Sequence, residues 1–191
     1  MPDPIENKVR FGLKNVHYAI WNGTTFGTPV AVPGAVNLDM SPSGDTSKFY
    51  ADNIAFYTTV ANQGYEGTLE LAKIPDGMLE DVWGYTMGST SKVLTENAFT
   101  EAKTFALLFQ IDGDQNNDHF VIYNCTGARP NIGSQTIEAS KEPRTQTIDL
   151  TAAPMSDGKV FAKTTKDTPS GTITAWYTTV FIEASASVTT T

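Results

Sequence analysis

The sequence contains few of the residues on which redox and metal chemistry depend. Among its 191 residues there is one cysteine, Cys125, and two histidines, His17 and His119. A single cysteine cannot form an internal disulfide, and the chain does not open like a secretory signal, so we expect folding in a reducing cytoplasm. The most apolar run, Phe105–Ile111, is much shorter than the roughly 20 residues of a spanning helix, so no membrane segment is expected.

Basic residues are also scarce. The net charge is −8, and residues 15–91 hold eight acidic residues against only Lys48 and Lys73. Tight phosphate binding depends on clustered Lys and Arg side chains that displace counterions. The sequence therefore argues against nucleic-acid binding, and its simplest interpretation is a soluble acidic surface.

Motifs for catalysis and cofactor binding are missing from the sequence. It has no Gly-x-Ser-x-Gly elbow before a helix and no glycine-rich phosphate loop after a strand. Glu66 and Glu70 would lie roughly 13 Å apart on one strand face, beyond the ~5–9.5 Å that paired glycosidase carboxylates require. We therefore expect no enzyme, no catalytic residue and no cofactor.

One stretch has the alternating oxygen ligands that open a calcium loop, namely Asp112, Asp114, Asn116 and Asp118. The sixth position is Asn117 where glycine is needed, and the twelfth is Tyr123 where a glutamate belongs. His119 and Cys125 are expected on one face of a strand, six residues apart, which is too far to chelate one metal alone. No metal site is expected.

Alternation of apolar and polar residues is the dominant pattern and predicts strands. We expect a hairpin of residues 9–13 and 16–21 with its turn at Lys14-Asn15, and an antiparallel pair of residues 105–111 and 120–125. Residues 65–71 predict a strand with one polar, solvent-exposed face, which we call the wet face. Further strands are expected near residues 145–150, 159–163 and 174–182. About nine short strands predict a mainly β fold, a β-sandwich or barrel.

One helix is predicted beside these strands. Pro75 suits its first position, acidic residues follow, and Gly84 ends it. Its apolar residues recur at helical spacing, so we expect it to cover one face of the sheet. The length favours a single domain, residues 1–184, followed by a low-complexity C-terminal tail, residues 185–191.

Residues 37–76 are the most informative stretch, because a turn-rich segment with aromatic residues leads there into an alternating strand. We expect an extended loop at about residues 40–60, and a solitary surface loop gains nothing by exposing aromatic side chains. Either the segment folds back on its own core, or it packs against another chain. The second reading gives these candidate inter-subunit residues: Pro42, Asp45, Lys48, Phe49, Tyr50, Asp52 and Asn53.

A family resemblance lies in the same residues. Residues 7–21, 37–76, 105–114 and 121–130, with the runs Phe-Tyr-Ala-Asp-Asn at 49–53, Gly-Tyr-Glu-Gly at 64–67 and Ile-Pro-Asp at 74–76, resemble the major tail (tail tube) proteins of long-tailed bacteriophages. The likeness is strongest to the phi13-type or TP901-1-like group. It covers nearly the whole chain and carries no catalytic signature.

The resemblance implies a structural virion protein of the tail, synthesised and assembled in the host cytoplasm. Its fold would be a β-sandwich, barrel-like tail tube fold with one flanking α-helix and extended loop and terminal arms. Six subunits would form a ring, rings would stack into a tube, and genomic DNA would pass through the lumen without specific binding. The implied partners are the tape measure, tail terminator and distal tail proteins. No interaction with a membrane is implied. We further hypothesise that the wet face at Glu66, Thr68 and Glu70 lines the lumen.

Three other interpretations remain open on the sequence. A carbohydrate-binding β-sandwich would use a stacking platform of Trp21, Tyr57 and Trp176. A small hydrolase would use Glu and Asp residues, for which no suitable geometry is found. A different tail component, such as a terminator or a contractile-tail inner tube, would share the fold of a tail tube protein.

Overall fold

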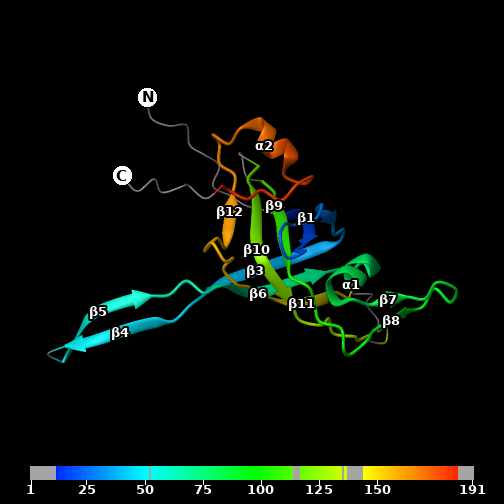
Figure 1. The fold of residues 1–191 in the computed structure, drawn as a ribbon, viewed down its shortest axis with the longest axis horizontal. Helices are drawn as coiled ribbons and strands as arrows, with labels where there is room; N and C mark the ends of the chain where they lie inside the picture. Colours follow the sequence, from blue (N-terminus) through cyan, green and yellow to red (C-terminus); the bar gives the residue numbers. More distant parts are fainter. Residues whose placement is uncertain (1–11, 52, 114–116, 135, 137–143, 185–191) are drawn as a thin grey trace.

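The computed structural model describes residues 12–51, 53–113, 117–134, 136 and 144–184 (Figure 1). The fold is mainly β, as the sequence predicts, and all strand pairings are antiparallel. The elements are β1 (Leu13–Ile20), β2 (Val30–Ala31), β3 (Ala35–Ser43), β4 (Thr46–Ala51), β5 (Ile54–Val60), β6 (Gly64–Leu71), α1 (Asp76–Trp83), β7 (Thr86–Met87), β8 (Leu94–Thr95), β9 (Phe105–Ile111), β10 (His119–Gly127), β11 (Gln146–Ala152), β12 (Phe161–Lys163) and α2 (Ser170–Ala175).

One eight-stranded sheet forms the body of the molecule. Its strand order is β2-β1-β9-β10-β11-β6-β3, and β12 pairs with β10 beside that path. In Figure 1 the strands β3, β6 and β11 run across β9 and β10, so the sheet curls over its inner face in a sandwich-like arrangement. β3 is a terminal strand of the sheet, and β1 also lies against it.

The inner core lies between these two parts of the sheet and under α1. Inward residues of β9, β10, β6 and β11 are nearly or fully buried there, together with three residues of α1: Met78, Val82 and Trp83. Tyr18 of β1 donates a hydrogen bond to Asp81 of α1 at 2.7 Å. Burial of this apolar surface is the main stabilising contribution to such a fold.

A second core covers the outer face of β9 and β10. Ala19, Ala106, Leu108, Val121 and Tyr123 face Trp176 and Val180 in this outer core. Alternate residues of β9 therefore enter different cores, which explains why its sequence is a continuous apolar run and not an alternation.

The predicted helix is confirmed as α1. It begins at Asp76 with Pro75 as the N-cap, one residue later than the sequence suggests. Gly84 ends it in the left-handed conformation, at φ 67°, and its N–H binds Glu80 O at 3.1 Å. Glycine adopts this conformation without steric penalty, so the predicted stop has the expected cause.

The predicted hairpin turn at Lys14-Asn15 is wrong. Both residues lie inside β1, which runs alongside β9 with a register shift between Lys14 and His17. Asn15 has φ 53° at that irregularity, a conformation that asparagine tolerates better than most residues. The same residue can therefore mark a bulge or a turn, and the predicted partner strand at residues 9–13 lies mostly outside the described residues.

The predicted strand at residues 174–182 is also wrong, so the body has a second helix in addition to the predicted one. α2 begins after Pro169, and the chain continues in turns to residue 179. Trp176 and Val180 are both buried in the outer core while Thr178 between them is exposed. A spacing of four residues fits a helical turn and not a strand, so packing overrides the β propensity of this segment.

The predicted extended loop is a two-stranded β-ribbon. β4 pairs with β5, and the pair forms a sheet of its own that projects from the body (Figure 1). We call β4 and β5 the arm. The arm continues from β3 and returns into β6, so both of its ends are anchored in the body sheet.

Candidate assembly surfaces

Backbone pairing defines the arm as a long hairpin. At its base, Ala61 N donates to Asp45 O at 3.0 Å and Gln63 N donates to Ser43 O at 2.9 Å. Further out, Phe49 faces Tyr57 across the ribbon, and the register shifts between Phe49 and Tyr50. Such a bulge strengthens the local twist of a ribbon.

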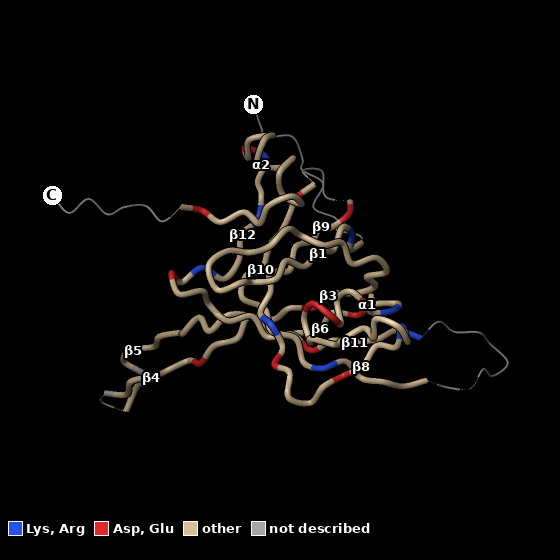
Figure 2. The backbone as a smooth tube through the Cα atoms, turned by 45° about the vertical axis from the view of Figure 1, so that its right-hand side comes forward, with Lys and Arg blue, Asp and Glu red and all other residues tan. Residues whose placement is uncertain are grey.

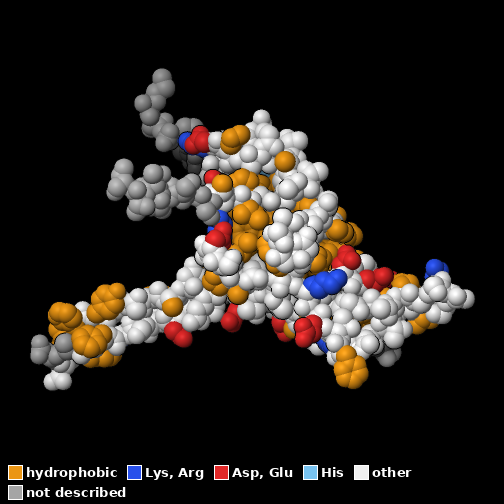
Figure 3. All heavy atoms as spheres, in the orientation of Figure 1, with side chains coloured by type: hydrophobic (Ala, Val, Ile, Leu, Met, Phe, Trp, Pro, Cys, Tyr) orange, Lys and Arg blue, Asp and Glu red, His pale blue; other side chains and the backbone are white. Residues whose placement is uncertain are grey.

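Both faces of the arm carry exposed apolar side chains. Six large ones are between 62% and 72% exposed: Phe49, Tyr50, Ile54, Phe56, Tyr57 and Val60. Phe56 and Tyr57 are adjacent in β5, so they point to opposite faces. Figure 3 shows most of these hydrophobic groups toward the outer end of the arm, while Val60 pairs with Thr46 at its base, and Figure 2 shows the arm largely free of charge.

The structure places six of the seven predicted inter-subunit residues, on the arm, at its base, at its tip and in β3. Lys48, Phe49 and Tyr50 lie in β4, on the arm itself. Asp45 and Asn53 lie at its base and at its tip, and Asn53 has φ 63°. Pro42 lies in β3, opposite Tyr65 of β6, and the seventh residue, Asp52, lies outside the described residues.

The predicted set stops at Asn53 and so leaves out β5. Four of the six exposed apolar residues belong to that strand. Their size and apolar character were the available signal, because a strand that returns beside β4 must expose its side chains in the same surroundings.

The wet face predicted on residues 65–71 is a three-stranded polar surface. Cross-strand partners share a face, and Glu66 lies between Ser41 and Thr151. The neighbouring rows are Asp39, Thr68 and Asp149, and then Asn37, Glu70 and Thr147. We call these nine positions the acidic face, because they hold four carboxylates and no Lys or Arg.

Short contacts hold part of the acidic face. Ser43 Oγ donates to Glu66 Oε1 at 2.9 Å, and Thr145 Oγ1 donates to Glu70 Oε1. On the opposite face of the same strand, Leu69 and Leu71 are fully buried. Sequence reasoning found the acids of β6 but not Asp39 and Asp149, because pairing with β3 and β11 joins residues far apart in the chain.

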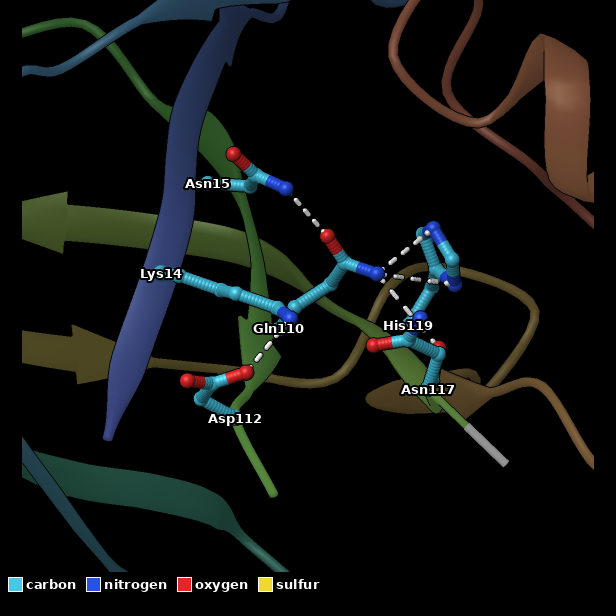
Figure 4. Close-up of polar contacts among 6 residues, drawn as sticks. All are labelled: Lys14, Asn15, Gln110, Asp112, Asn117 and His119. Atoms are coloured by element: carbon cyan, nitrogen blue, oxygen red, sulfur yellow. Dashed lines mark hydrogen bonds and ion pairs between the residues drawn. The ribbon is translucent and has the colours of Figure 1, made fainter. Parts of the chain in front are cut away.

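The calcium-like stretch is partly described. Asp112 lies 2.7 Å from Lys14 Nζ, and this ion pair lowers the pKa of its carboxyl group (Figure 4). Asp118 Oδ2 lies 3.1 Å from Lys163 Nζ. Asp114 and Asn116 lie outside the described residues. Two of the four oxygen ligands therefore already have a cationic partner.

His119 belongs to a small set of buried polar residues. The Nε2 atom of the His119 ring lies 2.9 Å from Nε2 of Gln110. The Oε1 atom of Gln110 accepts a hydrogen bond from Asn15 (Figure 4). Burial lowers the pKa of His119, although its contact with the Asn117 backbone and the charge of Asp118 act in the opposite direction. The ring packs against Trp176 and Tyr177 at 5.9 and 5.5 Å between centroids.

The expectation that His119 and Cys125 share a strand face is wrong. Asn124 has φ 50°, and the register of β10 with β9 shifts between Ile122 and Cys125. Cys125 consequently lies in the inner core, whereas His119 packs on the outer core. Burial raises the pKa of the Cys125 thiol to about 12.

The described residues hold no group of three His, Cys, Asp or Glu side chains that could bind a metal ion. In the same part of the chain, neither helix is long and apolar enough to cross a membrane. The three aromatic residues of the carbohydrate reading are not brought together. Trp176 is buried, Trp21 packs on Phe26 at 4.7 Å, and Tyr57 lies on the arm.

No family model matches the sequence, and no curated protein matches it. Several solved structures show a distant likeness. One is the baseplate of the anti-feeding prophage, with a TM-score of 0.45, 9% identity, and coverage of 88% of this chain and 100% of that chain. Another is the sheath/tube terminator of an extracellular contractile injection system, with a TM-score of 0.46, 11% identity, and coverage of 85% and 100%. A third is the tube terminating cap of the anti-feeding prophage, with a TM-score of 0.42, 12% identity, and coverage of 86% and 99%.

Proposed function

We propose that this chain is a structural subunit of a bacteriophage tail that self-assembles through its arm. The observation that carries the proposal is the arm itself, a two-stranded ribbon with large apolar side chains exposed on both faces. An isolated two-stranded hairpin is marginally stable in water. Contact with neighbouring subunits would bury these side chains and hold the ribbon in one conformation.

The more specific proposal is the major tail protein of a long-tailed phage, with six subunits in each ring and rings stacked into the tail tube. The sequence resemblance supports this assignment. The terminal position of β3 among the described strands of the sheet supports it too, because a terminal strand can pair with a strand of the neighbouring subunit and so close a barrel around a ring. The tape measure, terminator and distal tail proteins are the proposed partners.

The acidic face supports a role in DNA passage. It presents four carboxylates and no basic residue over three neighbouring strands. We propose that it lines the lumen, where it would repel phosphates and so prevent the DNA from binding. DNA would then pass along the tube without specific contacts.

Other tail roles are the main alternative. A tail terminator or the inner tube of a contractile tail would also use a ring-forming β subunit. Electron micrographs of the virions separate these roles, since a long repeating tube without a sheath is expected only where this chain is the tail tube protein of a non-contractile tail.

The arm provides a direct test. Residues 45–61 can be replaced by a short Gly-Ser turn, because the Gln63 N to Ser43 O hydrogen bond closes the hairpin below them. We expect a monomer that melts cooperatively at the temperature of the unaltered protein but forms no tubes. A matched control, Thr58→Ser with Thr59→Ser, keeps every apolar side chain of the arm and should assemble normally. Tubes formed by the shortened protein would contradict the proposal. If the shortened protein does not fold, the arm is needed for folding and not mainly for assembly.

A further inference from the structure

A second set of exposed apolar side chains lies on and after the β7–β8 hairpin, which projects from the other side of the body than the arm (Figure 1). There β7 and β8 form a short hairpin, followed by a turn that carries Phe99 (Figure 1). Phe99 is 96% exposed, the highest value among the exposed large hydrophobic residues that the structure describes. Val93 and Met87 of the same hairpin are 59% and 38% exposed. We call these three residues the Phe99 surface.

The turn that presents Phe99 is held on both sides. Arg129 Nη2 donates to Ala98 O at 3.3 Å and to Thr100 O at 3.2 Å, so one guanidinium binds the carbonyls before and after Phe99. Its Nη1 atom also binds Glu96 at 2.7 Å. Within the turn, Phe99 N donates to Asn97 Oδ1 at 3.0 Å.

These bonds fix the backbone of an exposed aromatic residue. A loop that is free to move loses conformational entropy when it binds, whereas a loop already held loses less. Exposed aromatic residues on such rigid supports are typical of the few positions that dominate the affinity of an interface. The hydrogen bonds of Arg129 therefore indicate a docking surface and not a solvent loop.

We infer that the Phe99 surface of one copy receives the arm of a second copy. This inference rests on the proposed self-assembly and adds the site at which the arm docks. The arm and the β7–β8 hairpin project from opposite sides of the body and differ in shape, so the contact joins unlike surfaces of successive copies (Figure 1). Such head-to-tail contacts extend into rings or filaments, as stacked rings require.

The exposed apolar area agrees with a partner of this kind. If a whole aromatic side chain offers roughly 200 Å², the six arm side chains at 62% to 72% exposure offer roughly 700 Å². A stable protein interface buries about 800 Å² on each partner. These side chains lie on both faces of the arm, so a contact on one face uses part of this area, and the Phe99 surface supplies an aromatic anchor for it.

Two variants test this contact by complementation. The arm variant changes Phe49, Tyr50, Phe56 and Tyr57 to Thr, which keeps strand propensity and leaves the Phe99 surface intact. The Phe99 variant carries Phe99→Ser and Val93→Thr and leaves the arm intact. The changed side chains are all exposed, so both proteins should melt as the unaltered protein does. Val30→Thr, at an exposed position of β2, is the control.

Sedimentation velocity of each variant and of their equimolar mixture gives the readout. Each variant alone lacks the contact between the arm and the Phe99 surface, so it should sediment as smaller species than the unaltered protein. The mixture should regain larger species, because an intact arm then meets an intact Phe99 surface. Phe99→Ser alone should weaken association by at least about tenfold. The Val30→Thr protein should associate as the unaltered protein does.

Three outcomes overturn the inference. A Phe99 variant that alone sediments as the unaltered protein does shows that the arm does not need the Phe99 surface. A mixture that sediments no faster than the separate variants shows that the arm docks elsewhere. A Phe99 variant that forms normal tubes, while the shortened arm abolishes them, removes the Phe99 surface as the docking site and leaves the proposed tail function standing.

Discussion

Two strand pairs of this protein, β9–β10 and β4–β5, carry apolar side chains on both faces, but only the first pair is covered. Residues of β9 such as Leu107 and Leu108 are fully buried, the first in the inner core and the second in the outer core. On the arm, Phe56 is 72% exposed. The same kind of sequence therefore exists in two opposite environments in one chain.

The difference shows what apolar residues on both faces of a strand pair predict. They predict that both faces are covered, and they do not identify the molecule that covers them. α2 and the following turns cover the outer face of β9–β10 from within the chain. Nothing comparable packs on the described side chains of the arm, and we propose that other subunits cover them.

The largest effect is expected when the cover of β9–β10 is removed. Trp176→Ala should lower the free energy of unfolding by about 3–5 kcal/mol, because a buried aromatic side chain is lost and a cavity opens over the strands. Urea denaturation measures this change. Trp21→Ala, at a half-buried position, is the control and should lower it clearly less. An effect below about 1 kcal/mol for Trp176→Ala would mean that the outer face does not need this cover.

The covered region should also make stability depend on pH. Burial lowers the pKa of His119 below its ordinary value of 6.5. The unfolded chain then binds a proton more readily than the folded protein, so stability should fall as the pH drops from 6.5 toward the lowered pKa and level off below it. Urea denaturation between pH 7.5 and 5 measures the fall. His119→Gln should flatten this part of the profile, and an unchanged profile would contradict the assignment.

The acidic face should tolerate changes of charge with little effect on folding. Glu66→Lys with Glu70→Lys should change the free energy of unfolding by no more than about 1 kcal/mol per site, because neither side chain enters the inner core. Tubes should form, but virions should eject DNA slowly, with the defect easing as salt screens the attraction. Glu66→Gln with Glu70→Gln is the control. Normal ejection by the lysine variant at low salt would remove the lumen assignment.

Truncation on the arm should scarcely affect folding. Phe56→Ala should change the free energy of unfolding by less than about 0.5 kcal/mol, since the side chain is exposed in the single chain. The measurement is made on monomers at low concentration. A loss of 2 kcal/mol or more would show that the arm packs on its own body, and the contrast with β9–β10 would disappear.

The smallest effect is expected for calcium. Thermal melts with millimolar calcium and with chelator should coincide, because two positions of the loop pattern hold the wrong residue and Asp112 and Asp118 already pair with lysines. A tight site would raise the melting temperature by several degrees through mass action. Such a shift would contradict the prediction.

Local signals in the sequence predicted the covered region well. Continuous apolar runs around Leu107 and Val121 specified β9 and β10, and Pro75 with Gly84 specified α1. Where a residue has two compatible conformations, the sequence was not enough. Asn15 forms a bulge within β1 and not a turn, and the β-branched segment around Thr174 becomes helical because Trp176 packs on the outer core.

The assembly surfaces were predictable only in part. The apolar character of the arm is visible in residues 49–57, but its form as a ribbon depends on β4 pairing with β5. Asp39 and Asp149 join Glu66 and Glu70 on one face only because β3 and β11 flank β6. No local pattern contains that pairing, which is why the acidic face is larger than the sequence indicated.

The burial of Cys125 has a practical consequence for assembled particles. The chain has one thiol, it is fully buried, and burial raises its pKa to about 12. At neutral pH it should therefore react very slowly with maleimides. A cysteine introduced at an exposed position would be the one addressable thiol of each chain, so dyes, metal clusters or enzymes could be attached at a single defined point that would repeat throughout the proposed assembly.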